Sequence, residues 1–194
     1  PPTDQETPIF EPLQGVYDEE DPGTFPHMML KEIHDQPTAL SNALSGRISA
    51  DGINSELSGF DLSPEQIKKL DRINLVACGT AYYASEIISS YIRQFTNLRS
   101  EAFIASEFPA KSVCSKNTLT IGVSQSGETK DTLDALFEAK KFGSHISSIC
   151  NVIGSTMARL TGNGAYLHAG PESAVASTKV VTNMVAVGLL FALT

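Results

Sequence analysis

The segment Thr118–Thr129, with the sequence TLTIGVSQSGET, constrains the fold most strongly. Its first half is apolar and rich in β-branched residues, which is typical of a short buried strand. Its second half holds hydroxyl side chains, an amide and Gly127, after which helix-forming residues begin. We therefore expect a buried strand that leads through a tight turn into a helix, as in domains built on a parallel sheet.

The same alternation of strand and helix continues along the chain from Ile73. The expected strands are short runs at 73–78, 101–105, 118–123, 145–150 and 165–168. The expected helices begin at Gly79-Thr80, span Thr129–Phe142 and span Ser177–Leu193. This order predicts an α/β fold, a three-layer αβα sandwich with a five-stranded, mainly parallel sheet.

Apolar residues at helical spacing indicate which faces of two helices turn toward the sheet. In the first helix these residues are Ile87, Ile88, Tyr91, Ile92 and Phe95. In the helix that Gly143 ends they are Leu133, Leu136 and Phe137.

The N-terminal third of the chain differs from the rest. We interpret residues 1–26, which are rich in proline and acidic side chains, as a linker or extended arm. Residues 27–70 are expected to form a helical lead-in, and residues 71–194 the ligand-binding domain. Since the chain starts at Pro1 and stops inside an apolar run at Thr194, we expect both ends to be boundaries within a longer protein.

Two helices are expected in the lead-in. Residues 27–44 predict one helix or a broken pair of helices, with Pro37 as the interruption. A second helix is expected to follow the capping residue Ser63, with Pro64 at its first position, and to run through Leu70.

The charge of the chain is unevenly distributed. The formal net charge is −8, but residues 1–25 carry seven acidic residues and no basic one. The remainder holds 15 acidic and 14 basic residues without a basic stripe, so we expect no nucleic-acid partner. An anionic ligand would then be held by backbone N–H groups and hydroxyls.

Other compositional features limit the function further. Cys78, Cys114 and Cys150 show no paired spacing and are expected to be reduced thiols of a cytoplasmic protein. The four histidines are scattered, so we expect neither a metal site nor another cofactor. The apolar run Met184–Leu193 is about half as long as a membrane helix of ~20 residues, so we expect a core helix and no membrane partner.

The candidate ligand site lies where the strands of the parallel sheet end. Ser124, Gln125, Ser126 and Thr129 there surround Gly127 at a helix N-terminus, where N–H groups attract anions. In an isolated turn, helix capping by Ser126 or Thr129 is the simpler role. The density of hydroxyls after a buried strand favours phosphate binding here.

Two further segments are expected at the same edge. In Cys78-Gly79-Thr80, Gly79 permits close approach of a ligand, and Thr80 caps its helix or reaches a sugar hydroxyl. Cys78 is interpreted as a small buried residue and not as a nucleophile, because the motif holds no histidine to activate it. The segment Pro171–Lys179 adds further hydroxyls. No G-x-G-x-x-G or G-x-x-x-x-G-K-[ST] motif is present, which favours a phosphomonoester over a nucleotide.

Six short motifs carry a resemblance to one known family. They are MLKEIHDQP (29–37), ACGTAY (77–82), ASEF (105–108), SQSGET (124–129), CNV (150–152) and VASTK (175–179). Together they resemble the first sugar-isomerase (SIS) domain of the glutamine–fructose-6-phosphate aminotransferases, or glucosamine-6-phosphate synthases. The resemblance implies a flavodoxin-like SIS fold and, for the whole enzyme, synthesis of glucosamine 6-phosphate from fructose 6-phosphate with ammonia from glutamine.

The resemblance also implies site residues. Phosphate-binding positions of the family match Ser124, Gln125, Ser126 and Thr129. Positions around the sugar match Cys78, Gly79, Thr80, Val175 and Ser177. One departure is Ala81, where the family often has a serine that donates to phosphate, so we expect one donor fewer in this chain.

Isomerisation of a sugar needs a positioned base. This chain offers Glu107, Glu128, Glu172 and His168, of which none is distinguished by its motif. The resemblance implies that the catalytic glutamate and lysines lie in a second SIS domain and that a histidine comes from the partner subunit. We therefore expect no catalytic residue in this chain and weak binding of fructose 6-phosphate or glucose 6-phosphate without turnover. The expected partners are the second SIS domain, the glutaminase domain and a second copy in a homodimer.

Two other functions fit the sequence. One is a non-catalytic SIS module that senses a sugar phosphate as part of a regulator, which a helix-turn-helix upstream would favour. The other is a nucleotide- or flavin-binding doubly wound domain, which a yellow preparation or stabilisation by nucleotides would favour.

Overall fold

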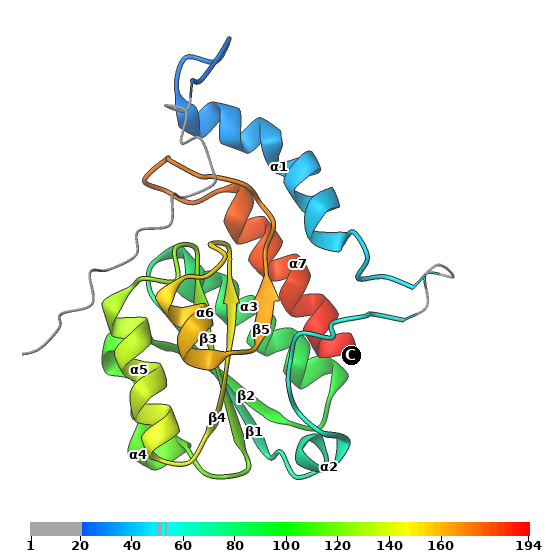
Figure 1. Cartoon of the computed structure of the whole chain (residues 1–194), viewed down its shortest axis with the longest axis vertical. Coiled ribbons are helices and arrows are strands. Elements are labelled where there is room, and N and C mark those ends of the chain that lie inside the picture. Colours follow the sequence, from blue (N-terminus) through cyan, green and yellow to red (C-terminus); the bar gives the residue numbers. More distant parts are fainter. Residues whose placement is uncertain (1–20, 50–51, 53) are drawn as a thin grey trace, which may run out of the picture.

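The computed structural model describes residues 21–49, 52 and 54–194 of the chain (Figure 1). Within these residues, five strands form one sheet with helices on both sides. The expected α/β fold, a three-layer αβα sandwich with a parallel sheet, is therefore confirmed. Most of the expected acidic arm, residues 1–26, lies outside the described residues and stays a prediction.

All five strands run parallel, in the spatial order β2-β1-β3-β4-β5. Their bounds are Arg72–Ala77 (β1), Arg99–Ile104 (β2), Thr118–Ser124 (β3), His145–Cys150 (β4) and Gly164–Tyr166 (β5). Successive connections run in opposite directions from the neighbouring strands β1 and β3, where Val76 lies opposite Gly122. Ligands of doubly wound sheets bind at this switch point, beyond the carboxyl ends of the strands.

Strand β3 lies at the centre of the sheet, and all seven of its residues are buried. Continuous burial is typical of parallel strands that are covered by helices on both faces. Polar side chains in the central strands find partners: Asn74 Nδ2 donates to the Val113 carbonyl at 3.2 Å, and the Thr120 hydroxyl lies 2.8 Å from that of Ser144. These bonds satisfy polar groups that the sheet buries.

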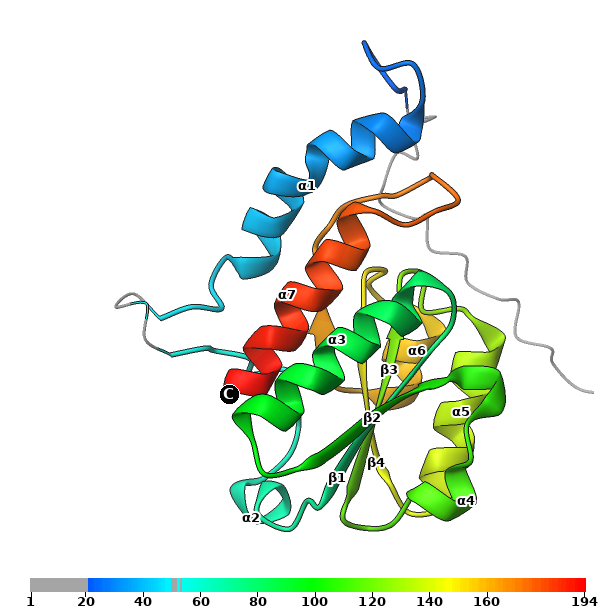
Figure 2. The ribbon, with the colours of Figure 1, turned by 180° about the vertical axis from the view of Figure 1, so that it is seen from behind.

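Helices α3 (Thr80–Phe95) and α7 (Lys179–Leu193) pack against each other on one face of the sheet (Figure 2). Ile88 and Ile92 of α3 are fully buried in this layer. Helix α1 (Met28–Leu44) lies along the outer side of α7 and so adds a further layer to the sandwich (Figures 1 and 2).

Helix α5 (Lys130–Lys141) covers the opposite face, where Leu136 and Met157 are fully buried. Three short helices were not predicted, because they are too short to show a helical period. They are η1 (Ala105–Glu107), α4 (Ala110–Val113) and α6 (Thr156–Thr161).

Helix α1 runs without interruption through Pro37, so the single-helix alternative is correct and the broken pair is wrong. Pro37 has no N–H to donate to the Ile33 carbonyl one turn earlier. The side-chain Nε2 of Gln36 donates to that carbonyl instead, at 3.1 Å. The helix thus replaces the missing backbone bond with a neighbouring side chain.

Two other helices are shorter than expected. Helix α2 spans Pro64–Ile67 and does not reach Leu70, although Ser63 caps it as predicted and forms a reciprocal capping box with Gln66. The closing helix begins at Lys179, two residues later than expected, because the preceding residues belong to a loop.

Three apolar side chains that were expected to face inward do not. Ile87 and Phe95 of α3 are 43% and 48% exposed, and Phe137 of α5 is 53% exposed. The buried stripe of α3 is centred on Ile88 and Ile92 and is completed by small residues, which sequence hydropathy does not reveal.

Candidate functional site

Residues Ser124–Thr129 form the turn between β3 and α5, which we call the serine turn. The Ser124 hydroxyl accepts the N–H of Gly127 at 3.0 Å and lies 3.3 Å from the Thr129 hydroxyl. These contacts fold the turn back on itself. They bring two hydroxyl groups together at the start of α5.

Helix α5 begins without a side-chain cap, although capping was the simpler alternative for Ser126 and Thr129. The Thr129 hydroxyl makes no capping bond, and Ser126 Oγ accepts the N–H of Glu128, before the helix begins, at 3.1 Å. No cap therefore engages the first-turn N–H groups of α5, which carry the partial positive charge of a helix N-terminus. An anion such as phosphate fits this position.

Gly127 holds the serine turn against the start of α6. Its φ is +67°, and a Cβ at this position would lie 2.2 Å from Ser155 Oγ and 2.6 Å from Ser155 Cβ. The Gly127 carbonyl accepts the N–H of Met157 at 3.0 Å. The turn therefore needs glycine both for its backbone conformation and for its close packing.

Residues Cys78–Thr80 form the neighbouring turn between β1 and α3, which we call the glycine turn. Gly79 has a φ of +58°, and a Cβ there would meet nothing within 4 Å. No side chain caps α3, and among the described residues the Thr80 hydroxyl has no hydrogen-bond partner. The glycine turn thus offers open space, a hydroxyl and a second helix N-terminus.

The two turns meet through Cys78 and Thr132. The Thr132 hydroxyl, buried in the first turn of α5, donates to Cys78 Sγ at 3.9 Å. Ala81 is 7% exposed in the first turn of α3 and presents a methyl group where a serine would supply a hydroxyl. The structure therefore brings the residues predicted in both turns to one edge of the sheet.

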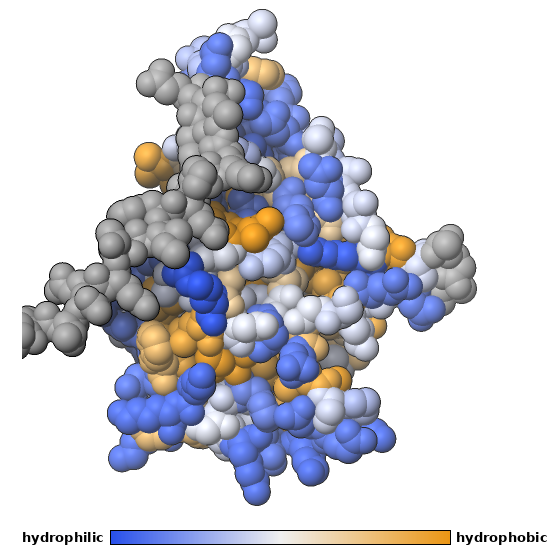
Figure 3. All heavy atoms as spheres, viewed as in Figure 1, coloured by the Kyte–Doolittle hydropathy of each residue, from blue (hydrophilic) through white to orange (hydrophobic). Residues whose placement is uncertain are grey.

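Residues 170–178 form the loop before α7, which we call the α7 loop (Figure 1). The carboxylate of Glu172 accepts the Ser177 hydroxyl at 2.5 Å and the Thr178 N–H at 2.8 Å, so it caps α7 from the outside. Val175 is fully exposed, and Figure 3 shows apolar atoms at the outer end of this loop. The Ser177 hydroxyl proton is thus already engaged within the loop.

Asn151 joins the serine turn to the α7 loop, and no role was assigned to it from the sequence. Its backbone N–H donates to the Gln125 carbonyl at 3.2 Å. Its side chain donates to the Gly170 carbonyl at 2.7 Å and accepts the Ala169 N–H at 2.9 Å. The partners are 18 and 19 residues away on one side and 26 on the other, which explains why local motifs did not reveal the link.

The four candidate bases do not form a catalytic group. Glu172 caps α7, and Glu107 is exposed in η1. Glu128 accepts the N–H of Thr156 at 2.8 Å, and this bond lowers the pKa of its carboxyl. Glu128 therefore caps the N-terminus of α6.

His168 lies beyond β5 in a left-handed conformation with a φ of +51°. Its ring centroid lies 6.4 Å from that of Tyr166. Partial burial, followed by the positive charge of Arg47, lowers the pKa of His168. Both effects disfavour the protonated ring of His168.

Two cavities lie outside these turns. One of about 200 Å³ is lined by residues such as Gly59 and Gly164, and one of about 340 Å³ is lined by residues that include Lys69, Lys116 and His145. Neither includes a residue of the serine turn, glycine turn or α7 loop. We place the candidate site at the turns, since helix N-termini and hydroxyls there supply the groups that bind an anion.

The residues that the structure describes hold neither a metal-binding group nor a membrane-spanning helix. No three side chains of the His, Cys, Asp and Glu types come together there as a metal-binding group. None of the helices in this part of the chain combines the length and apolarity needed to cross a bilayer. Cys78, Cys114 and Cys150 are free cysteines.

The fold and the position of the turns define a ligand-binding domain of the doubly wound α/β class. A model of the SIS domain family matches residues 66–194. The chain belongs to the SIS domain family.

Similar proteins agree with this assignment. The chain is 45% identical over 175 residues to a glutamine–fructose-6-phosphate aminotransferase [isomerizing] of Clostridium acetobutylicum, covering 88% of this chain. It is 43% identical over 171 residues to the protein of the same name from Thermus thermophilus. The match spans 29% and 28% of the length of these relatives.

Solved structures show the same architecture. The C-terminal domain of glucosamine-fructose-6-phosphate aminotransferase from Francisella tularensis superposes with a TM-score of 0.79 at 33% identity, over 89% of this chain and 49% of that chain. A tagatose-6-phosphate ketose/aldose isomerase from Escherichia coli matches with a TM-score of 0.69 at 20% identity, over 87% of this chain and 47% of that one, which supports the fold alone. The resemblance seen in the sequence motifs is confirmed.

Proposed function

We propose that the chain binds a sugar phosphate, with fructose 6-phosphate as the ligand, and serves in an enzyme that makes glucosamine 6-phosphate from fructose 6-phosphate and glutamine. One observation carries this proposal. Two helix N-termini without side-chain caps, those of α3 and α5, meet beside hydroxyl groups at the switch point of the sheet. The names of the relatives supply the reaction.

The phosphate is assigned to the serine turn. Ser124, Ser126 and Thr129 offer hydroxyls, and the first turn of α5 offers N–H groups. Gln125 adds an amide at the same turn. These neutral donors suit a phosphomonoester dianion in a domain without a basic stripe.

The sugar is assigned to the space between the glycine turn and the α7 loop. Gly79 leaves room for close approach, and the Thr80 hydroxyl is available. We assign Cys78 to one side of this space, and Ser177 and the exposed Val175 of the α7 loop to the other. Asn151 supports this arrangement because it ties the α7 loop to the serine turn.

No proton-transfer role is proposed for this chain. Glu128 and Glu172 are engaged as helix caps, and burial and the charge of Arg47 lower the pKa of His168. The reaction would therefore depend on partners: a second SIS domain, a glutaminase domain and a second copy in a homodimer. We also propose a cytoplasmic location, which the three free cysteines favour.

A sensor module of a regulator is the second candidate. The sugar isomerase domain of an RpiR transcription factor from Sphaerobacter thermophilus shares the fold, with a TM-score of 0.60 at 17% identity over 85% of both chains. Identity of 45% to the aminotransferase relative favours the enzyme. Both functions use the same sugar-phosphate site.

Calorimetric titration of the full 194-residue chain tests the binding. Fructose 6-phosphate is expected to bind and fructose is not, because the phosphate contacts dominate. Ser124→Ala combined with Thr129→Ala should abolish binding while the circular dichroism spectrum is retained. The control pair Ser90→Ala and Ser112→Ala removes two exposed hydroxyls elsewhere and should bind normally. Unchanged affinity in the first pair would refute the phosphate assignment.

A turnover assay tests whether the chain can catalyse the reaction without its proposed partners. The purified chain is expected to form no glucosamine 6-phosphate from fructose 6-phosphate with glutamine or ammonia. Formation of this product would show that a base within the chain had been overlooked.

A further inference from the structure

Glu32 on α1 is fully buried, although a carboxylate is costly to remove from water. Its Oε1 accepts the N–H of Ser173 at 2.6 Å and the N–H of Ala174 at 3.1 Å. Both partners belong to the α7 loop and lie 141 and 142 residues further along the chain. Helix α1, which precedes the sheet in the sequence, is therefore hydrogen-bonded through Glu32 to the loop assigned to the sugar.

No cation among the described residues pairs with Glu32. The lysines of the two helices concerned, Lys31 and Lys179, both pair with Asp35 at 3.3 Å. The other oxygen of Glu32, Oε2, is buried without a hydrogen-bond partner among the described residues. Since the desolvation of the carboxylate is offset mainly by the loop N–H groups, these bonds are the evident reason for a glutamate at this position.

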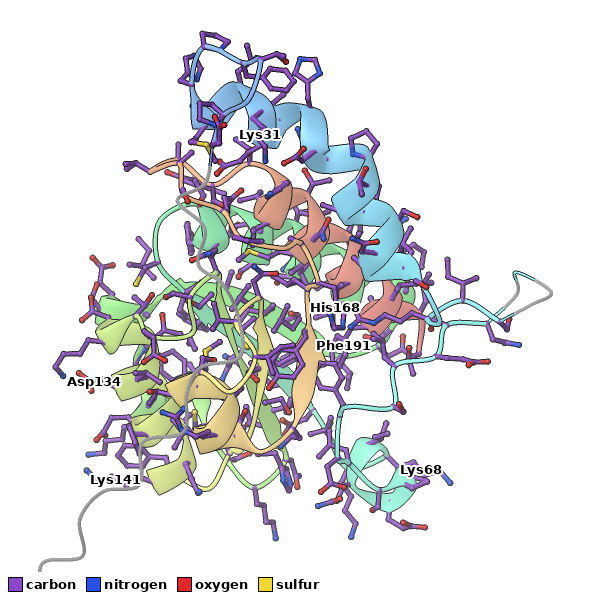
Figure 4. The ribbon with its side chains drawn as sticks, turned by 45° about the horizontal axis from the view of Figure 1, so that its top comes forward. Lys31, Lys68, Asp134, Lys141, His168 and Phe191 are labelled. Carbon is purple, nitrogen blue, oxygen red and sulfur yellow. The ribbon has the colours of Figure 1, made fainter. Side chains whose placement is uncertain are left out.

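Helix α1 is itself fixed to α7 by a row of polar contacts. The Thr182 hydroxyl donates to Gln36 Oε1 at 2.6 Å, and Asn183 Nδ2 donates to the Ala39 carbonyl at 2.9 Å. The Lys179–Asp35 pair continues this row toward the loop. Figures 1 and 2 show α1 lying along α7, and Figure 4 shows Lys31 on the part of α1 nearest the loop. Glu32 therefore reaches the α7 loop from a helix that polar contacts join to α7.

The α7 loop is held at three points. Asn151 holds its start at Gly170, and Glu172 holds its end at Thr178. Glu32 holds the middle, directly before Val175. The N–H groups of Val175 and Ala176 make no hydrogen bond within the described residues, so the Glu32 bonds are the ties that lie directly beside Val175.

We infer that Glu32 is a positioning residue for the sugar site: it fixes the α7 loop so that Val175 and Ser177 meet the sugar. This inference rests on the proposed function. Residue 32 lies outside the matched family segment 66–194, so the sugar site depends on a lead-in helix that the SIS unit itself does not contain. No hydrogen bond among the described residues joins Glu32 to the serine turn, so we expect the serine turn to keep its phosphate chemistry.

Substitutions of Glu32 distinguish its effect on the sugar-binding part of the site from its effect on the phosphate-binding part. Glu32→Ala removes the acceptor and should weaken fructose 6-phosphate binding about tenfold or more, as expected for the loss of two charged hydrogen bonds. Binding of inorganic phosphate should change less than about twofold, because that ligand needs only the serine turn. Glu32→Gln keeps one acceptor oxygen and should restore most of the affinity for fructose 6-phosphate.

A matched control is Glu138→Ala. Glu138 lies in α5 between Asp134 and Lys141, which Figure 4 shows on the outer surface of that helix. This variant should bind both ligands as the unchanged chain does. Equal loss of fructose 6-phosphate and inorganic phosphate binding in Glu32→Ala would overturn the positioning role, as would unchanged binding of the sugar phosphate.

Amide hydrogen exchange of the unchanged chain tests the same contact without a substitution. The N–H groups of Ser173 and Ala174 should exchange about tenfold or more slowly than those of Val175 and Ala176. Equal rates would overturn the inference even if Glu32→Ala fails to fold. Failure of the unchanged chain to bind fructose 6-phosphate, with slow exchange at Ser173 and Ala174, would instead refute the proposed function and leave the Glu32 contact established.

Discussion

Gly127 shows how a single residue shapes the candidate site. Its positive φ and its approach to Ser155 both exclude a side chain. Gly154 has a similar φ of +69°, but a Cβ there would meet nothing within 4 Å. Alanine at position 154 would therefore cause backbone strain alone, whereas alanine at position 127 would cause both backbone strain and steric overlap.

Gly127→Ala is expected to lower the free energy of unfolding by about 3 kcal/mol, of which about 1–2 kcal/mol is the strain of a left-handed conformation. Gly154→Ala should lower it by the strain alone, about 1–2 kcal/mol. Urea denaturation of both variants measures the difference. Equal losses would contradict the tight packing of Gly127 on Ser155.

Ala81 permits a gain-of-function prediction at the same scale. Ala81→Ser places a hydroxyl in the first turn of α3, beside the two turns. One added donor should raise the affinity for fructose 6-phosphate about fivefold, equivalent to about 1 kcal/mol. Calorimetric titration of this variant with fructose 6-phosphate measures the change in affinity. An affinity that stays equal or falls would place the phosphate away from α3.

Residues of the site differ in how far the sequence could predict them. The serine turn consists of six consecutive residues that directly follow an apolar run, so its glycine and hydroxyls are visible as one motif after a strand. Asn151, Ser155 and Glu32 act through partners that are distant in the chain. Their side-chain types are ordinary for a loop, a cap and a surface helix, so only the folded arrangement reveals their role.

At the scale of elements, the contact between α3 and α7 depends on Gly188. A Cβ at this position would lie 2.3 Å from Ile88 Cγ1 and 2.8 Å from Ile88 Cγ2. These atoms are fixed by the branched side chain of a fully buried residue. Helices α3 and α7 can approach closely because α7 has no side chain at Gly188, where it packs on Ile88.

Gly188→Ala should lower the free energy of unfolding by about 1–2 kcal/mol, because overpacking outweighs the ~1 kcal/mol that alanine gains over glycine in helix propensity. Thermal or urea denaturation provides the measurement. In an Ile88→Ala background the same change should be neutral or stabilising. A stabilising effect in the unchanged background would show that the helices are further apart.

The elements themselves were largely predictable, with informative exceptions. All five strands were expected, because apolar runs between glycine-containing turns mark parallel strands. The predicted inward orientation of Ile87, Phe95 and Phe137 was wrong. A hydropathy pattern assigns large apolar residues to the inner face of a helix even where small residues fill that face. The continuity of α1 at Pro37 depended on a side-chain bond that no pattern shows.

At the scale of the whole molecule, three lowered pKa values predict the pH dependence of stability. Hydrogen bonds from Lys31 and Lys179 outweigh burial and lower the pKa of Asp35, and a hydrogen bond from Thr156 lowers that of Glu128. The pKa of His168 is also lowered. In each case the unfolded chain binds protons more readily, so stability falls as the pH falls.

The free energy of unfolding should therefore be highest above about pH 6.5, the ordinary pKa of histidine, and decline first as the pH falls through the lowered pKa of His168. A second decline should follow below about pH 4, where Asp35 and Glu128 become protonated. Urea denaturation across this range tests both steps. His168→Asn, which tolerates a positive φ, should remove the first decline; persistence of that decline would assign it to another group.

The arrangement of the whole molecule places two polar regions at different parts of the surface: the turns at the carboxyl edge of the sheet, and the cavity lined by Lys69, Lys116 and His145. The first has two helix N-termini without side-chain caps beside hydroxyls. The central claim is that a sugar phosphate binds there.

Amide chemical-shift mapping by NMR tests that claim most directly. Titration of the 194-residue chain with fructose 6-phosphate should shift the amides of Ser126–Lys130 and of Gly79–Ala81, while fructose alone should leave them unchanged. Saturable shifts confined to Lys69, Lys116 and His145, or no shift at the serine turn at ligand saturation, would contradict the account.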